Sequence, residues 1–235
     1  KTIASPAIRN SATLGGNLCL DTRCYFYNES EMWRVGLGGC LKLNIPAGDN
    51  GSVCHAAPGK NTCQAVFSSD TAPLLIALDA SVRLISSEGE RTIPLFDLYH
   101  EDGIAFLKLK QGEIMADVIL SPPYSNLKAV HRKIRQRESI DFPLVNVGIA
   151  ARLETTAIAR NIRIVLGAVA SAPARVHEAE HLLEGLELTD NRIVLAGELA
   201  ASVVNPMPNT AGTVAYRKRM AKVLVERTLR ELRGL

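Results

Sequence analysis

The cysteines of this chain are confined to one stretch, and this constrains its fold more than any other feature. All five cysteines of the 235-residue sequence lie at positions 19, 24, 40, 54 and 63. The odd count and a start that reads as neither a signal nor a transit peptide argue against a disulfide framework. We therefore expect a cytoplasmic protein whose cysteines serve metal or redox chemistry. The abrupt beginning also suggests that part of the natural N-terminus is missing.

The loop that holds the cysteines, about residues 18–69, has no sustained hydrophobic period. Long irregular loops in compact domains are usually functional or disordered, and the cysteines give this one a reason to be ordered. Four of them could form one site: Cys24, Cys40, Cys54 and Cys63. Their gaps are too wide for a ferredoxin-type run and unlike paired zinc knuckles. Spacing alone leaves a [4Fe–4S] cluster, a structural zinc and unrelated free thiols as alternatives. His55 could replace one ligand, and Cys19 is expected to be a small buried residue.

The rest of the chain predicts an α+β protein. A helix should begin at Ser69-Asp70-Thr71, where small polar residues precede a proline and an apolar run. Strands are expected at 81–86, 91–93 and 113–120, and the prolines at 122 and 123 read as a domain boundary. After them come three strands, at 128–135, 145–153 and 161–169, and then three helices, at 175–183, 191–204 and 213–232. Strands followed by helices are typical of a small α+β domain.

Charge and hydropathy exclude two classes of partner. The net charge is +3, and no basic run with interleaved aromatic residues indicates a nucleic-acid interface. No apolar run approaches the roughly 20 residues needed to span a bilayer. We expect neither nucleic acid nor membrane as a partner.

A glycine pair near the start could bind a phosphate. Residues 9–17 form a turn-rich segment that ends in Thr13-Leu14-Gly15-Gly16-Asn17. Small residues let backbone N–H groups approach an anion, and Thr13 and Asn17 could add side-chain hydrogen bonds. The motif by itself is weak, because pairs of glycines are common in turns.

The wider pattern resembles the flavoprotein subunits of the xanthine oxidase, or molybdenum hydroxylase, family. The resemblance lies in residues 8–17, in 69–78 some 40 residues later than usual, and in 80–84, 89–95 and 216–220. The cysteine loop separates the first two segments like an insertion. A four-cysteine insertion at this point resembles one branch, the β subunits of 4-hydroxybenzoyl-CoA reductases, as do residues 17–24, 26–28, 40–42 and 133–143.

The resemblance implies a fold and two cofactors. Residues 1–122 would be the second half of a PCMH-type FAD-binding domain. Residues 123–235 would be a domain like the C-terminal domain of CO dehydrogenase flavoproteins, with a three-stranded sheet and three helices. FAD would lie with its pyrophosphate near the Thr13–Asn17 turn, which includes Gly15 and Gly16. Asp70 would meet its ribose or phosphate side, and Lys133 would approach from the C-terminal domain. Asp70 could equally be a helix N-cap and Lys133 a surface residue. The four cysteines would hold a [4Fe–4S] cluster.

The resemblance also implies a function. The chain would be an oxidoreductase subunit that relays electrons and contributes no catalytic residue to the substrate reaction. Its partners would be a molybdopterin-bearing large subunit, a [2Fe–2S] small subunit and a low-potential donor such as ferredoxin. The complex would remove a phenolic hydroxyl from an aromatic acyl-CoA during aromatic degradation. The alternatives are the FAD subunit of an oxidative molybdenum hydroxylase, such as xanthine or CO dehydrogenase, which normally lacks the cysteine loop; a zinc-stapled binding module; and a structural subunit with a vestigial loop.

Overall fold

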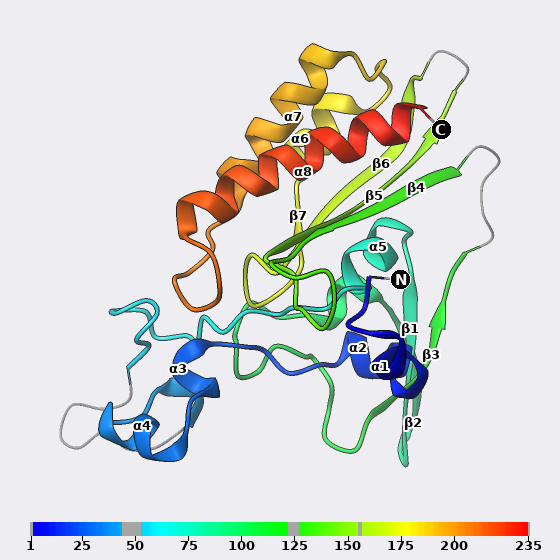
Figure 1. Cartoon of the computed structure of the whole chain (residues 1–235). Coiled ribbons are helices and arrows are strands. Elements are labelled where there is room, and N and C mark those ends of the chain that lie inside the picture. The colour runs from blue at the N-terminus through cyan, green and yellow to red at the C-terminus, as the bar shows by residue number, and fades with distance from the viewer. Residues whose placement is uncertain (1, 44–52, 122–126, 155–156, 235) are drawn as a thin grey trace.

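The computed structural model describes residues 2–43, 53–121, 127–154 and 157–234. Two antiparallel sheets organise the chain, one of three strands and one of four (Figure 1). The expected α+β class is confirmed. Residues 44–52 of the cysteine loop and the prolines expected at the domain boundary lie outside the described residues.

The N-terminal segment is helical, so the prediction of a turn-rich stretch over 9–17 is wrong. It forms two short helices, α1 (Pro6–Ser11) and α2 (Leu14–Leu18). The side chains of Ser5 and Thr13 accept hydrogen bonds from backbone N–H groups in the first turns. These N-caps stabilise helices that two adjacent glycines would otherwise disfavour. The glycine pair thus lies inside a capped helix.

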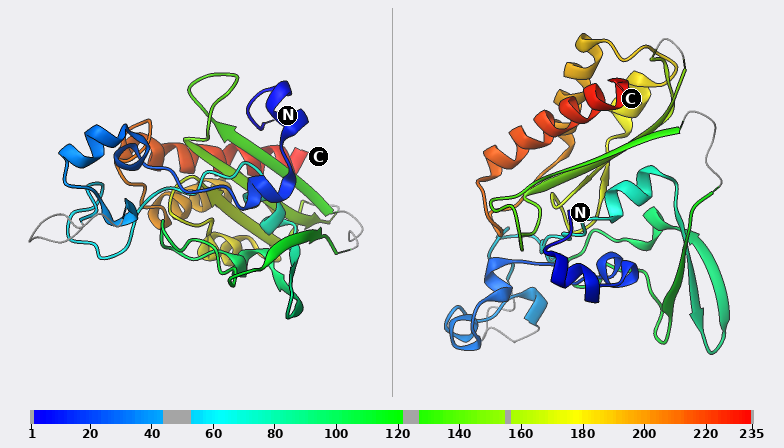
Figure 2. Two further views of the ribbon diagram at one scale, coloured as in Figure 1. Left: turned by 90° about the horizontal axis from the view of Figure 1, so that it is seen from below. Right: turned by 45° about the vertical axis from the view of Figure 1, so that its right-hand side comes forward.

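The cysteine loop also contains helices where none was expected. They are α3 (Tyr25–Asn28), α4 (Glu31–Gly36) and the 3₁₀ turn η1 (Leu41–Leu43). The loop projects from the body of the molecule, at the lower left of Figure 1 and of the right-hand view of Figure 2. It returns to the body at α5 (Ala72–Ala77).

The three-stranded sheet follows α5 in the order β2-β1-β3. Its strands are β1 (Ser81–Ser86), β2 (Gly89–Pro94) and β3 (Ile114–Ile119), and the 3₁₀ turn η3 (Leu95–Leu98) follows β2. Together with α5 and Leu18, this sheet encloses a first apolar core.

The four-stranded sheet has the order β4-β5-β6-β7. Its strands are β4 (Leu127–Ile134), β5 (Val145–Leu153), β6 (Ala159–Gly167) and the two-residue β7 (Ala174–Arg175), which the sequence did not predict. Three helices cover one face: α6 (His177–Leu183), α7 (Asp190–Val203) and α8 (Val214–Gly234) (Figure 1). α5 packs on the opposite face of β5 and β6.

Strand β5 is buried on both faces because each face meets a different layer. Side chains alternate along a strand, and Val147 and Ile149 join the core beneath α7 and α8 whereas Ala150 joins the core around α5. Gly148, on the α5 side, allows the closest approach: a Cβ atom there would lie 2.5 Å from backbone atoms of Leu74. The two halves of the chain are therefore in direct contact. No helix of the described part has the length and apolar character needed to cross a membrane.

Candidate cofactor sites

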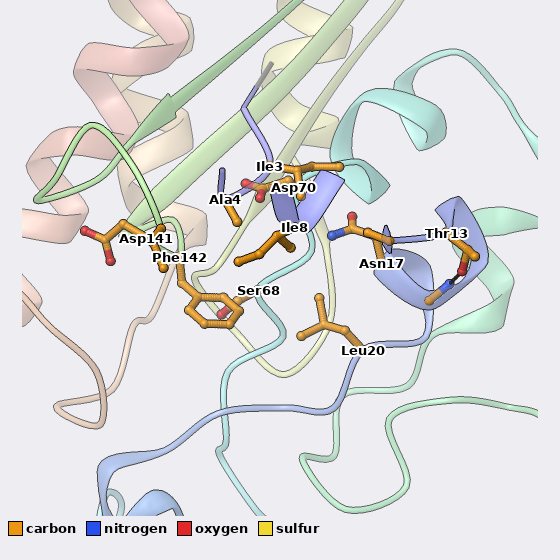
Figure 3. A pocket seen from close by; sticks show the side chains of 13 residues that line it. Ile3, Ala4, Ile8, Thr13, Asn17, Leu20, Ser68, Asp70, Asp141 and Phe142 are labelled. Atoms are coloured by element: carbon orange, nitrogen blue, oxygen red, sulfur yellow. Dashed lines mark hydrogen bonds between the residues drawn. The ribbon is translucent and has the colours of Figure 1, made fainter. Parts of the chain in front are cut away.

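The main candidate site is a cavity of about 380 Å³ between the N-terminal helices and the four-stranded sheet. We call it the flavin pocket, after the FAD site that the sequence resemblance predicts beside the Thr13–Asn17 segment. Its walls come from three distant segments, as Figure 3 shows: residues 3–20, residues 68–70 and residues 140–142. Apolar side chains form much of the lining, and the polar residues that line it are Thr13, Asn17, Ser68, Asp70 and Asp141. A mainly apolar cavity with a few convergent polar groups is the usual form of a cofactor site.

Helix α2 and its N-cap bring most of the predicted phosphate motif to the flavin pocket. Thr13, Gly16 and Asn17 line it, and Gly15 is not among the lining residues. The Gly16 N–H donates to Thr13 Oγ1 at 3.0 Å, and neither glycine has a positive φ. A Cβ atom at Gly16 would lie 3.0 Å from Thr13 Oγ1, whereas one at Gly15 would meet only Met115 Sδ at 4.0 Å. Gly16 matters here for the space around it and not for an unusual backbone angle.

Asn17 ties α2 to the chain that returns from the cysteine loop. Its Oδ1 accepts hydrogen bonds from Ser69 Oγ (2.9 Å), Thr71 Oγ1 (2.7 Å) and Thr71 N–H (3.1 Å). These three hydrogen bonds to the side-chain carbonyl oxygen of Asn17 hold Ser69–Thr71 in place. The amide nitrogen is the end of this side chain that points toward the cavity (Figure 3).

Asp70 and Lys133, predicted from opposite halves of the chain, form a buried ion pair. Lys133 Nζ lies 2.8 Å from Asp70 Oδ1, and their side chains are 2% and 8% exposed. Burial raises the pKa of Asp70, and the ammonium of Lys133 opposes that rise. Asp70 lines the flavin pocket, whereas Lys133 stands behind it. Asp70 is not the N-cap of α5: Thr71 holds that position without a side-chain cap bond, and Ser69 Oγ accepts from the N–H of Ala72.

Lys133 also anchors the loop over 135–143. Its ammonium donates to the Asp141 carbonyl at 2.7 Å and to the Thr2 carbonyl at 3.0 Å. The Asp141 carboxylate accepts from the N–H groups of Gln136 and Arg137, which closes the loop on itself. The loop thereby presents Ile140, Asp141 and Phe142 to the flavin pocket.

A second, smaller cavity of about 20 Å³ lies in the cysteine loop, and we call it the thiol pocket. Its lining includes the four cysteines that the sequence singled out, Cys24, Cys40, Cys54 and Cys63. All four side chains are buried, at 7–8% exposed. Cys19 is half-buried at the end of α2 and does not line this pocket. The fold therefore gathers these four thiols from a long stretch of sequence.

The surroundings of the thiols combine burial with donors and one cation. Burial raises the pKa of Cys63 to about 11, opposed by the N–H of Ala65 and by the charge of Lys42. Burial likewise raises the pKa of Cys24, opposed by the N–H groups of Phe26 and Tyr27. Thiols in this environment stay protonated until a metal or cluster displaces the proton.

Lys42, which the sequence analysis missed as a site residue, closes one side of the thiol pocket. Its Nζ contacts Asp21 Oδ1 and Thr22 Oγ1 at 2.6 Å each and the Gly103 carbonyl at 3.1 Å. The ammonium also lies 4.7 Å from the ring centroid of Tyr27. Its place two residues after Cys40 was the available signal.

His55 lines the thiol pocket, but its Nε2 lies 2.6 Å from the Gly39 carbonyl. Across the described ranges, no group of three or more His, Cys, Asp or Glu side chains is arranged to hold a metal ion. The structure therefore gives no direct support for a bound zinc or cluster, and the iron–sulfur assignment stays a prediction.

Comparison with known families decides the wider identity. Residues 1–123 match the FAD-binding domain in molybdopterin dehydrogenase, and residues 130–232 match the CO dehydrogenase flavoprotein C-terminal domain. The chain belongs to the FAD-binding molybdopterin dehydrogenase family. The matches confirm the expected pair of domain types, while the boundary at 122/123 remains a prediction.

Relatives with known roles share this family. The FAD-binding subunit PaoB of the Escherichia coli aldehyde oxidoreductase is 33% identical over 231 residues, covering 95% of this chain and 68% of PaoB. The glyceraldehyde dehydrogenase medium chain of Sulfolobus acidocaldarius is 27% identical over 164 residues, covering 70% of this chain and 57% of the relative. The family resemblance inferred from the sequence is thus confirmed at the level of FAD-binding subunits of molybdenum hydroxylases. The narrower resemblance to 4-hydroxybenzoyl-CoA reductases goes beyond these similarities and stays a prediction.

Solved structures share the fold of this family member. Carbon monoxide dehydrogenase from Hydrogenophaga pseudoflava superposes with a TM-score of 0.74 at 21% identity, covering 100% of this chain and 65% of the other. Quinoline 2-oxidoreductase from Pseudomonas putida gives a TM-score of 0.69 at 21% identity, covering 99% and 64%. The chain thus spans about two thirds of these structures.

Proposed function

We propose that this chain is the FAD-carrying electron-transfer subunit of a molybdenum enzyme and that its cysteine loop carries a second redox centre. The observation that carries the proposal is the pairing of two pockets: a flavin pocket in an FAD-binding family member and, beside it, a thiol pocket lined by four cysteines. The partners would be a molybdopterin-bearing large subunit and a [2Fe–2S] small subunit. A low-potential donor such as ferredoxin would supply electrons.

The flavin pocket fits part of an FAD molecule. The first N–H groups of a helix have no partner within it, so the start of α2 at Thr13 can meet a pyrophosphate oxygen. Gly16 leaves room for that approach, and the Asn17 amide can donate a further hydrogen bond. Asp70 can accept from a ribose hydroxyl while Lys133 balances its charge. When bound, FAD supplies the exchange of one and two electrons, and these residues hold and orient it.

The thiol pocket fits a [4Fe–4S] cluster better than isolated thiols. Four cysteines supply one soft thiolate for each iron. The N–H groups beside Cys24 and Cys63 can bond to sulfur, and the buried ammonium of Lys42 offsets negative charge. Such contacts raise the potential of a cluster.

The test of the second centre compares two cysteines in the whole enzyme complex, purified without oxygen. Cys24→Ser removes a thiol that lines the thiol pocket, and Cys19→Ser is the matched control outside it. We expect about four irons per chain beyond those of the partner subunits. That count should fall in the first variant and persist in the second. Equal iron loss in both variants, or no additional iron in the wild type, would contradict the assignment.

The direction of electron flow distinguishes the reductive function from the main alternative, an oxidative molybdenum hydroxylase. We favour transfer toward molybdenum, for reductive removal of a phenolic hydroxyl from an aromatic acyl-CoA, because the cysteine loop resembles that of 4-hydroxybenzoyl-CoA reductase β subunits. The 33% identity with an aldehyde oxidoreductase subunit favours the rival. Activity assays of the complex with a reduced low-potential donor and an aromatic acyl-CoA, and separately with aldehydes and an oxidant, distinguish the two. Turnover of aldehydes alone would make the chain an oxidative subunit.

A further inference from the structure

Two chain segments connect the flavin pocket with the thiol pocket. Leu20 lines the first and Cys24 the second, so a segment of five residues joins them. A second segment runs from Cys63 in the thiol pocket to Ser68 in the flavin pocket. The two segments pair through an antiparallel bridge between Arg23 and Val66. A change in either segment therefore reaches both pockets.

Arg23 lies at the crossing point of these segments. Its N–H donates to the Val66 carbonyl at 2.8 Å, and its own carbonyl accepts from the Val66 N–H at 2.7 Å. These two bonds fix the backbone next to Cys24. The Arg23 side chain leaves this bridge toward the C-terminal half of the molecule.

The guanidinium of Arg23 stacks on Phe142. Its Cζ atom lies 3.6 Å from the centroid of the Phe142 ring. Phe142 lines the flavin pocket, and Figure 3 shows its ring facing Ser68 and Leu20. A guanidinium this close to an aromatic face makes a cation–π contact, which is stronger when the cation is partly desolvated. Arg23 is half-buried.

The hydrogen bonds of the loop that carries Phe142 run largely within the loop and to Lys133 on β4. The Asp141 carboxylate accepts from N–H groups of the loop itself, and the Asp141 carbonyl accepts from Lys133, which also contacts Asp70 and the Thr2 carbonyl in the N-terminal half. The Ile140 N–H reaches the Ala4 carbonyl at 3.3 Å, a long hydrogen bond. Ile140 and Phe142 are 59% and 42% exposed, so packing holds them weakly. The stack on Arg23 is thus a major attachment of this wall to the cysteine segment.

We propose that Arg23 is a positioning residue that holds Phe142 as a wall of the flavin pocket. Because Arg23 is next to Cys24, the position of the cysteine segment determines the position of Phe142. No family description given above assigns a role to either residue. The inference rests on the proposed function only in taking this pocket as the FAD site.

The experiment uses the whole complex and four variants: Arg23→Ala, Arg23→Lys, Phe142→Leu and, as a control, Arg132→Ala. Lysine keeps the charge but loses the planar stacking surface. Arg132 is also partly exposed, but it pairs with Glu231 on α8. Two quantities are measured: the dissociation constant of FAD, and the hydrogen exchange of residues 136–143 in flavin-free protein.

We expect both Arg23 variants and Phe142→Leu to weaken FAD binding by about two- to tenfold, the range of one cation–π contact. Exchange in 136–143 should rise in the same variants and not in the control. Combining Arg23→Ala with Phe142→Leu should add little to either single change, because both remove one contact. Arg23→Lys keeps the test decisive if the alanine variant folds poorly.

Three outcomes would overturn the proposal: exchange that matches the control, faster exchange with unchanged FAD affinity, or fully additive effects of the two substitutions. A wild-type complex without FAD would instead refute the proposed function. Hydrogen exchange in the flavin-free protein reports on the Arg23–Phe142 contact whether or not FAD binds. A failure of this proposal can therefore be told apart from a failure of the proposed function.

Discussion

At the scale of single residues, the two adjacent glycines of α2 have different surroundings. Gly16 faces the flavin pocket and Thr13, whereas Gly15 has open space up to Met115. Both glycines had the same expected role, since a linear motif does not say which residue of a helical turn faces a cavity. Only Gly16 has a steric reason to stay a glycine.

Gly16→Val should therefore weaken FAD binding severely, and Gly15→Val should have little effect on it. The added Cβ at Gly16 would crowd Thr13 Oγ1 and fill the space into which a pyrophosphate oxygen must come. Valine lowers helix propensity equally at both positions, so the pair is matched. Flavin occupancy of the purified full-length proteins measures the difference. Similar losses in both variants would mean that the effect comes from the helix and not from the pocket.

At the scale of elements, the start of α8 binds three segments through one buried arginine. The side chain of Arg217 donates to the carbonyls of Leu144 and Met207 at 3.1 Å each and to that of Ala168. These carbonyls lie before β5, after α7 and after β6. Burial lowers the pKa of Arg217 to about 10, which leaves it charged at neutral pH. The residue belongs to the 216–220 segment that resembles the family, but its role is structural.

Arg217→Met should destabilise the protein by about 3–5 kcal/mol in the free energy of unfolding, because buried acceptors lose a charged donor. Arg219→Met, two residues on and exposed, should change it by less than about 0.5 kcal/mol. Urea unfolding followed by circular dichroism gives both values. A small effect at Arg217 would show that water replaces the guanidinium at these carbonyls.

At the scale of the whole molecule, the flavin pocket depends on how α5 packs against β5. This contact joins the two halves, and both Asp70, just before α5, and Lys133, on β4, reach the pocket region through it. Gly148 sits where the two elements come closest. The Nδ2 of the buried Asn146 adds a hydrogen bond to the Ser69 carbonyl at 2.9 Å.

Gly148→Ala should therefore lower the free energy of unfolding by about 3 kcal/mol, as overpacking does at a close contact. It should also weaken FAD binding, since the Asp70–Lys133 pair is drawn apart. Gly36→Ala is the control, because a Cβ at Gly36 has nothing within 4 Å. Thermal unfolding and flavin occupancy are the measurements. Normal FAD binding in a destabilised Gly148 variant would show that the pocket does not depend on this contact.

Much of the fold follows from local sequence patterns. The strands at β1, β3 and β5 and the helices α6 to α8 agree with the predicted ranges to within a few residues, because side-chain periodicity records which face is buried. The short helices α1 and α2 were missed because their stability comes from side-chain caps at Ser5 and Thr13 and not from an apolar stripe. β7, with two residues, is too short to show a period.

The candidate sites, like the fold, could be predicted only in part from the sequence. By itself the sequence determined which residue types were available: a cysteine cluster suited to soft metals, a glycine pair, and an acid and a lysine in opposite halves. Only the tertiary structure decided which of them meet. It brought four thiols around one pocket, paired Asp70 with Lys133, and placed Phe142 over Arg23. Contacts between residues far apart in the sequence depend on how sheets and helices pack, and a local sequence pattern does not specify which distant residues will meet.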